Sequence, residues 1–173
     1  GGDSNILYVG LGTTPANEAE IWRCDLSATC TATAGWTQIG GDGLNTSWNT
    51  NYESVRRLLV SGTTMYVGLG DSGGDAEVWQ CTNCTATPTW TKLGGDGTYL
   101  AGQSWGANHT QVNSFTLDGT TLYVGISSTA FSSELWRCDT GATCTNTAGW
   151  TPLGGGYINN SWELMGIQTV QEL

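Results

Sequence analysis

A short segment that recurs three times constrains this chain more than any other feature. Each copy has the pattern small residue, Glu, aliphatic residue, Trp, Arg or Gln, Cys, and the copies begin at Ala19, Ala76 and Ser133. Successive copies therefore start 57 residues apart, at positions 19, 76 and 133. Self-similarity at a fixed period is the signature of a repeat architecture, so we expect three equivalent units.

Each copy belongs to a larger pattern of four short strands. A Tyr-Val-Gly strand precedes the Glu-x-Trp strand, as in residues 66–68, and a Trp strand ending in Gly-Gly follows it, as in residues 90–95. A further strand, residues 55–60 in the second unit, joins the Tyr-Val-Gly strand through a tight turn at Gly62, where glycine supplies the positive φ of a hairpin. Four antiparallel strands per repeat are typical of β-propeller blades.

The sequence therefore predicts an all-β fold, a β-propeller with four-stranded antiparallel blades in a single domain, residues 1–173. The expected repeats cover residues 1–54, 55–111 and 112–165, and residues 166–173 form a closing strand. β-Branched and aromatic residues interrupted by glycine favour these short strands and tight turns over helices.

The closing strand predicts how such a propeller is completed. Val170 and Leu173 stand at the positions of Val55 and Leu58, whereas the first blade lacks its own copy of that strand. Three blades are too few for a ring, because propellers have about four to eight. We expect a homodimer with six blades, in which each closing strand completes the first blade of the other chain. The alternative is a fragment of a longer propeller.

The repeat resembles the blades of kelch and Asp-box β-propellers. The shared features are a Tyr-Val-Gly strand, a strand with Trp and a closing Trp strand, and the likeness covers essentially the whole chain. The resemblance implies the fold and not the chemistry of either family.

The charge of the chain narrows the choice of partners. The formal net charge is −10, with only five Lys and Arg residues. Such a surface repels phosphate backbones and anionic lipids, so neither nucleic acid nor a membrane surface is an expected partner. The sequence also contains no apolar run of about 18 residues, the length that a membrane-spanning helix needs, so we expect no membrane insertion.

The cysteines predict an oxidising environment. They fall two to a repeat, just after each Glu-x-Trp strand, and are Cys24, Cys30, Cys81, Cys84, Cys138 and Cys144. An even number of Cys in local pairs predicts three short disulfides and a secreted protein. The spacing of Cys81 and Cys84 also fits a redox or zinc CxxC motif, which is the alternative for that pair.

No residue set predicts catalysis. The only histidine, His109, falls in a connection between repeats and is interpreted as a surface loop residue. A glycosidase with paired carboxylates is the residual alternative, since that chemistry needs only two acids about 5–10 Å apart. Asp71 and Asp75 are interpreted as an acidic turn, with a calcium site as the alternative. We therefore expect neither an enzyme nor a cofactor.

The tryptophans are the main candidates for ligand binding. The six on strands are expected to pack blade against blade. The third set lies in the connections, beside Asn, Gly and Ser, and consists of Trp48, Trp105 and Trp162; Asp42 and Asp96 precede the first two. An indole face beside amides and carboxylates suits a sugar ring. The alternative is that each of these residues is buried between two neighbouring blades and fills the space there.

A glutamate recurs beside the strand tryptophans. Glu20, Glu77 and Glu134 share a face with the following Trp, because side chains alternate along a strand. A partly buried carboxylate needs donors, either from the protein or from sugar hydroxyls. If the donors are sugar hydroxyls, the chain resembles fucose-binding propeller lectins, whose short subunits assemble six-bladed rings. The resemblance implies that these Glu residues, with Arg23 and Arg137, bind sugar.

The sequence thus predicts a non-catalytic, extracellular β-propeller module that binds carbohydrate through its inter-blade loops. The alternative is a structural or assembly protein whose exchanged strand links subunits. A lectin should have Trp48, Trp105 and Trp162 partly exposed in similar pockets, whereas a structural protein should have all nine tryptophans buried.

Overall fold

The computed structural model describes residues 5–12, 18–27, 29–48, 52, 54–70, 76–95, 105, 109–128, 133–141, 144, 149–155 and 170–173. The predicted all-β class is confirmed. The described helical segments are two short 3-10 turns, η1 (Thr33–Gly35) and η2 (Leu44–Thr46). Within the described ranges, no helix is long and apolar enough to cross a membrane.

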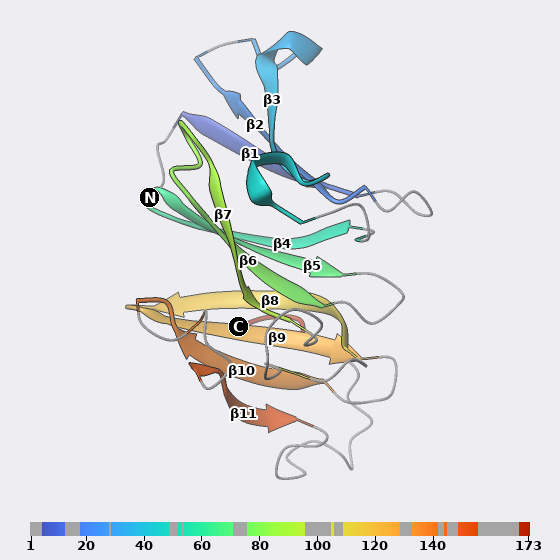
Figure 1. Ribbon diagram of the computed structural model, residues 1–173, viewed down its shortest axis with the longest axis vertical. Helices are drawn as coiled ribbons and strands as arrows, with labels where there is room; N and C mark the ends of the chain where they lie inside the picture. Colours follow the sequence, from blue (N-terminus) through green and yellow to red (C-terminus); the bar gives the residue numbers. More distant parts are fainter. Residues whose placement is uncertain are drawn as a thin grey trace.

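The strands fall into three antiparallel units that follow one another along the chain. The first unit consists of β1 (Ile6–Leu11), β2 (Glu20–Asp25) and β3 (Trp36–Gly40). The second consists of β4 (Ser54–Ser61), β5 (Thr64–Gly70), β6 (Glu77–Thr82) and β7 (Thr89–Gly94). The third consists of β8 (His109–Asp118), β9 (Thr121–Ser128), β10 (Glu134–Asp139) and β11 (Thr151–Gly155). Figure 1 shows the three units stacked along the long axis of the molecule.

The units are joined by equivalent single bridges. Gly12 pairs with Ser54 between the first and second units, and Gly70 pairs with Gln111 between the second and third. The second bridge merges two units into one curled antiparallel sheet, so that the strands form about half of a barrel. An equivalent backbone bridge therefore connects each unit to the next.

A β-bulge recurs at the same place in every unit. The register between the Glu-x-Trp strand and the following strand shifts just before Trp22, Trp79 and Trp136. The shift leaves one extra residue out of the ladder on the following strand, and this residue is Ile39, Leu93 or Leu153. A bulge disrupts the ladder locally and bends the strand, so the backbone here is available for other contacts.

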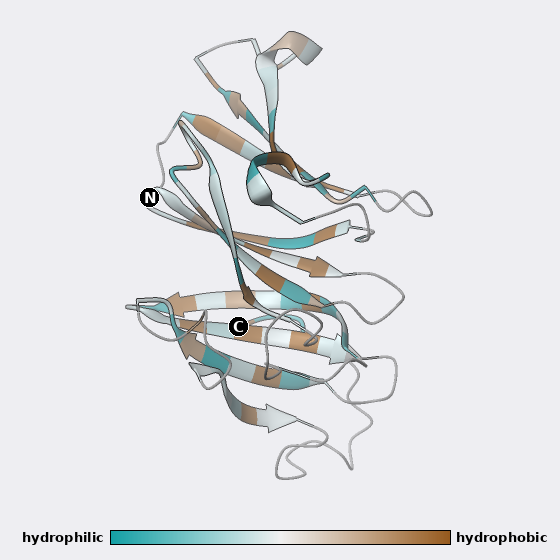
Figure 2. Cartoon of the chain, viewed as in Figure 1, coloured by the Kyte–Doolittle hydropathy of each residue, from teal (hydrophilic) through white to brown (hydrophobic). Residues whose placement is uncertain are grey.

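The hydrophobic core lies between the units, in two seams. The buried residues at the first seam include Ile21 and Ile39 on one side and Met65, Val67 and Leu69 on the other. Their equivalents at the second seam are Val78 and Leu93, and Leu122, Val124 and Ile126. Figure 2 shows hydrophobic and hydrophilic residues alternating along the strands, which is the pattern that gives each sheet an apolar face. Each seam is thus a copy of the other.

All three predicted disulfides are present. They join Cys24 to Cys30, Cys81 to Cys84 and Cys138 to Cys144, so the pair with CxxC spacing is a disulfide as well. Such disulfides are compatible with a secreted protein.

The acidic turn is not tested by the structure, because Asp71 and Asp75 lie outside the described residues. Among the residues that the structure describes, no three His, Cys, Asp or Glu residues are grouped as metal ligands.

The first disulfide loop also carries a local turn. The Ser27 hydroxyl and the Ser27 backbone N–H donate to Asp25 Oδ1 at 2.7 and 2.9 Å, and these bonds lower the pKa of the exposed Asp25 carboxyl. In the third unit the backbone N–H of Gly141 donates to Asp139 Oδ1 at 2.9 Å in the same way. Asp at the strand end therefore shapes the loop that the disulfide closes.

Replacing Gly40 with Ala should destabilise the first seam. An added Cβ would lie 2.7 Å from Cζ2 of Trp90, so the indole would have to move. Overpacking of this kind costs about 1–3 kcal/mol, and the midpoint of urea unfolding should fall accordingly. Thr37→Ala, at an exposed position of the same strand, is the control and should have a much smaller effect. An unchanged midpoint for Gly40→Ala would contradict the packing described here.

Candidate functional site: the tryptophan-lined seams

Each recurring glutamate is hydrogen-bonded to the tryptophan two residues later. Trp22 Nε1 donates to Glu20 Oε2 at 2.6 Å, and the equivalent distances are 2.7 Å for Trp79 with Glu77 and for Trp136 with Glu134. The two side chains meet because residues i and i+2 of a strand lie on one face. The Glu-x-Trp pattern is therefore a side-chain pair that repeats once per unit.

Two of these glutamates have a further ionisable neighbour. Glu77 forms an ion pair with Lys92 of β7, and Glu134 Oε2 lies 3.3 Å from Nε2 of His109. Both glutamates are buried, and a buried carboxylate is stable only when it is paired and hydrogen-bonded. Glu20, at the same position of the first unit, is partly exposed. The acids at this position thus serve the packing of their own units.

The second glycine of each Gly-Gly pair makes room for the glutamate. A Cβ on Gly155 would lie 2.6 Å from Cγ of Glu134, and one on Gly95 would lie 3.0 Å from Cγ of Glu77. Gly41 has a φ of 104°, which side chains rarely adopt, and Gly155 has a φ of 157°. Glycine at this point lets the backbone approach the carboxylate closely.

The two connection tryptophans that the structure describes are buried in the seams. Trp48 and Trp105 are each only 2% exposed, and their Nε1 atoms donate to the carbonyl oxygens of Ala19 and Ala76 at 2.6 and 2.8 Å. Trp162 lies outside the described residues. The indole faces of Trp48 and Trp105 are thus covered by protein.

Strand tryptophans pack edge-on against these residues. The Trp48 ring centroid lies 5.0 Å from that of Trp90, and the Trp105 centroid lies 5.2 Å from that of Trp150. T-shaped pairs of this kind stabilise by about 0.5–1.5 kcal/mol beyond the area they bury. Trp90 and Trp150 are buried, as expected for core residues, whereas the other four strand tryptophans are partly exposed.

The aspartates predicted to accompany the connection tryptophans are not brought into a site with them. Asp42 is exposed in a turn before η2, where its φ is 55°, while the Trp48 side chain is buried. Asp96 lies outside the described residues. The described residues therefore pair each recurring glutamate with a strand tryptophan of its own unit, while Asp42 lies on the surface.

The interpretation of His109 as a surface loop residue is wrong. His109 is 3% exposed and is the first residue of β8. Its carbonyl oxygen accepts a hydrogen bond from the backbone N–H of Ala76 at 3.0 Å, as Tyr52 does from Ala19 in the preceding unit. The strand begins earlier than its hydrophobic pattern indicates, because this backbone contact fixes its start.

A hydrogen bond across each seam was not predicted from the sequence. Trp90 Nε1 donates to the carbonyl oxygen of Ile39 at 2.7 Å, and Trp150 Nε1 donates to that of Leu93 at 2.9 Å. Ile39 and Leu93 are the bulged residues, which explains why their carbonyls accept from an indole. The only sequence signal is the fixed Trp-x-x-Ile/Leu-Gly-Gly spacing.

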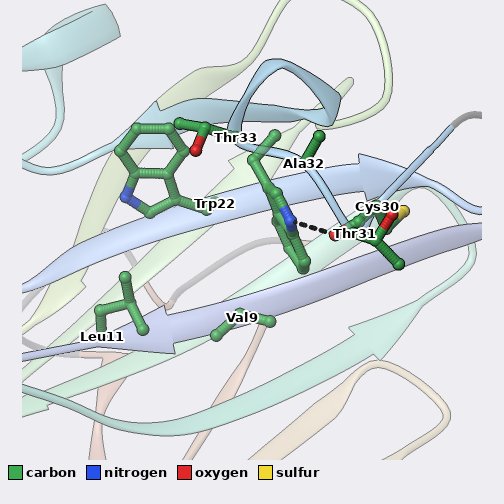
Figure 3. Close-up of a pocket in the computed structure, with 8 residues that line it drawn as sticks. Val9, Leu11, Trp22, Cys30, Thr31, Ala32 and Thr33 are labelled. Carbon is green, nitrogen blue, oxygen red and sulfur yellow. Dashed lines mark hydrogen bonds between the residues drawn. The ribbon is translucent and has the colours of Figure 1, made fainter.

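The first unit carries a hollow of about 480 Å³ on the side away from the first seam. Its lining includes Val9 and Leu11 of β1 and Trp22 of β2, with the segment that follows Cys30 as a rim (Figure 3). The repeat equivalents of Val9 and Leu11 are buried at both seams. This surface is therefore the first unit's copy of a seam-forming face.

No family model, curated protein or solved structure matches the chain. The role of these residues is accordingly inferred from their own geometry.

Replacing Glu77 with Gln should destabilise the second unit more than Glu20→Gln destabilises the first. The new amide would keep an acceptor for Trp79 but remove the counter-charge that Glu77 gives to the ammonium of Lys92, whose side chain is 14% exposed. Breaking a buried ion pair costs about 3–5 kcal/mol. Glu20 is the matched control, because Gln38 occupies the position of Lys92 in its unit. Equal free energies of unfolding for the two variants would contradict this assignment.

Proposed function

We propose that the chain is a non-catalytic, extracellular β-propeller module that assembles with a second copy into a six-bladed ring. In this proposal each described unit is one blade. Support comes from the two seams, which repeat the same burial, the same indole hydrogen bond and the same single bridge. Blades of a propeller pack face to face with this kind of regularity.

The position of Val170 carries the proposal. A Cβ on Gly10 or Gly68 would meet Cγ1 of a valine near the start of the next unit's first strand, Val55 of β4 or Val112 of β8, at 2.4 and 2.6 Å. On Gly125 it would meet Cγ1 of Val170 at 2.7 Å. The Ser114 hydroxyl also donates to the Val170 carbonyl oxygen at 3.2 Å. Val170 thus makes the contact that Val55 and Val112 make near the start of the first strand of the next unit.

The first unit offers the edge that such a strand needs. Strands β5 and β9 each lie between two neighbours of their own unit, whereas β1 has β2 as its only full strand neighbour among the described residues. An open edge strand is a template for pairing with another chain. We assign the segment that contains Val170, from a second copy, to this edge.

Assembly has more support than carbohydrate binding. The indoles of Trp48 and Trp105 are covered, and the buried glutamates at Glu77 and Glu134 are occupied by their own units. A sugar-binding site needs an exposed indole face with nearby acceptors. Because Glu77 and Glu134 are already bonded to side chains of their own units, their arrangement also supports a non-catalytic role.

The Val170→Asp variant should dissociate the ring. The chain has a mass of 18.2 kDa, so the proposed dimer has about twice that mass in light scattering at micromolar concentration. A charge placed between the closing segment and Gly125 is desolvated and should shift the variant toward the monomer. Gln171→Asp adds the same charge at an exposed position and is the control. A wild-type chain that is monomeric would contradict the proposed assembly.

A further inference from the structure

We infer that the front face of the first unit docks on the back face of the third unit of a second copy, through the same contacts that form the internal seams. The front face consists of Leu7, Val9, Leu11, Trp22 and Trp36, and the back face consists of Leu135 and Leu153. The inference rests on the proposed two-chain ring and names the surfaces that close it.

The front face is an exposed copy of a surface that is buried twice elsewhere in the chain. Leu7 is 42% exposed and Leu11 is 45% exposed. Their equivalents Met65 and Leu69 in the second unit, and Leu122 and Ile126 in the third, are all 0% exposed. The residues at these positions are large and apolar in all three units, so the difference lies in the presence of a preceding unit.

The back face of the third unit is likewise more exposed than the equivalent faces of the first two units. Leu153 is 39% exposed, whereas its equivalents Ile39 and Leu93 are 1% and 2% exposed. Leu153 is also the bulged residue of its unit, as they are of theirs. At each internal seam a bulged residue of this kind packs in the cluster of the following unit's front face. Leu153 therefore fits the hollow of the first unit that Figure 3 shows.

One hydrogen bond defines the register of the docked faces. Trp150 Nε1 donates at 2.9 Å both to Leu93 across the second seam and to the carbonyl oxygen of Cys144 in its own disulfide loop. Trp36 Nε1 donates to the carbonyl oxygen of Cys30, the equivalent of Cys144, at 2.8 Å. In the docked copy the second acceptor for Trp36 is the carbonyl oxygen of Leu153.

An arginine supplies a second polar contact. Arg23 Nη1 donates across the first seam to the carbonyl oxygen of Cys84 at 2.6 Å. Arg137 is the equivalent of Arg23 and is exposed, and Cys30 is the equivalent of Cys84. Docking brings the Arg137 guanidinium to the Cys30 carbonyl. A hydrogen bond that involves a charged group is stronger than a neutral one, so this contact adds to the apolar burial.

The arrangement is head to tail, because the front face is complementary to the back face and not to itself. Contacts of this type close into a ring when the rotation permits, and otherwise extend into a filament. Two chains of three units make two identical contacts of this kind and leave neither face exposed. A second copy of this chain is therefore the occupant that satisfies both ends at once.

Three Leu→Asp variants at similarly exposed positions test the inference. Leu11→Asp changes the front face and Leu153→Asp changes the back face, while Leu26→Asp, at a position 54% exposed outside both faces, is the control. Burying an unpaired carboxylate in either contact should weaken dimerisation at least about tenfold. Leu26→Asp should leave the dimer intact. Light scattering gives the mass of each, and circular dichroism confirms that each variant is folded.

Mixing the two face variants gives the decisive measurement. A heterodimer of Leu11→Asp with Leu153→Asp has one intact contact, formed by the unaltered front face of one chain and the unaltered back face of the other. Neither variant alone can form an intact contact. The mixture should therefore regain association at least about tenfold over either variant alone.

The outcomes separate this inference from the proposed ring. If wild-type chain is a dimer but both face variants dimerise equally well, the docking inference fails and the strand-completed ring stands. If only Leu11→Asp dissociates, or if mixing restores nothing, the head-to-tail docking is wrong. A monomeric wild-type chain would overturn both and leave the front face to a different partner, such as a further repeat of a longer protein or a glycan.

Discussion

Burial of one unit's apolar face against the next is the interaction on which the rest of the structure depends. A unit of three or four short strands encloses no core by itself, and the buried aliphatic residues of the described clusters lie between units. Edge-on tryptophan pairs pack in each seam, and an indole N–H donates to a carbonyl oxygen of the neighbouring unit's bulged strand. The bulge, the glycine pair and the connection tryptophan are all parts of this one contact.

The strands and disulfides could be predicted from the sequence because they are local. Hairpin turns, alternation and paired cysteines act between residues that are close in the chain, and the threefold repeat supported each assignment with two others. The role of Trp48 and Trp105 could not be predicted in the same way, since the polar residues beside them suit an exposed indole as well as a buried one. Their burial depends on a neighbouring unit that no local pattern describes. The burial of His109 could not be predicted for a related reason, because its backbone contact with Ala76 spans 33 positions (109 minus 76).

The recurring glutamate illustrates how a functional pattern and a packing pattern converge. An acid beside a tryptophan is what a sugar site requires, and it is also what a buried indole N–H requires. Glu77 and Glu134 satisfy the second need, with Lys92 and His109 close by. In a chain with few charged residues, acids that repeat with the fold are therefore weak evidence for a ligand.

Each disulfide closes a loop within a single unit, with separations of only 6, 3 and 6 residues, and these bridges use all six cysteines. No covalent bond thus ties one unit to another except the backbone itself. A duplicated gene segment encoding one more unit would bring its own cysteines, its own bulge and both faces of a seam. Such an array can lengthen or shorten by whole units during evolution without a new interface having to arise, since each unit contacts only its neighbours.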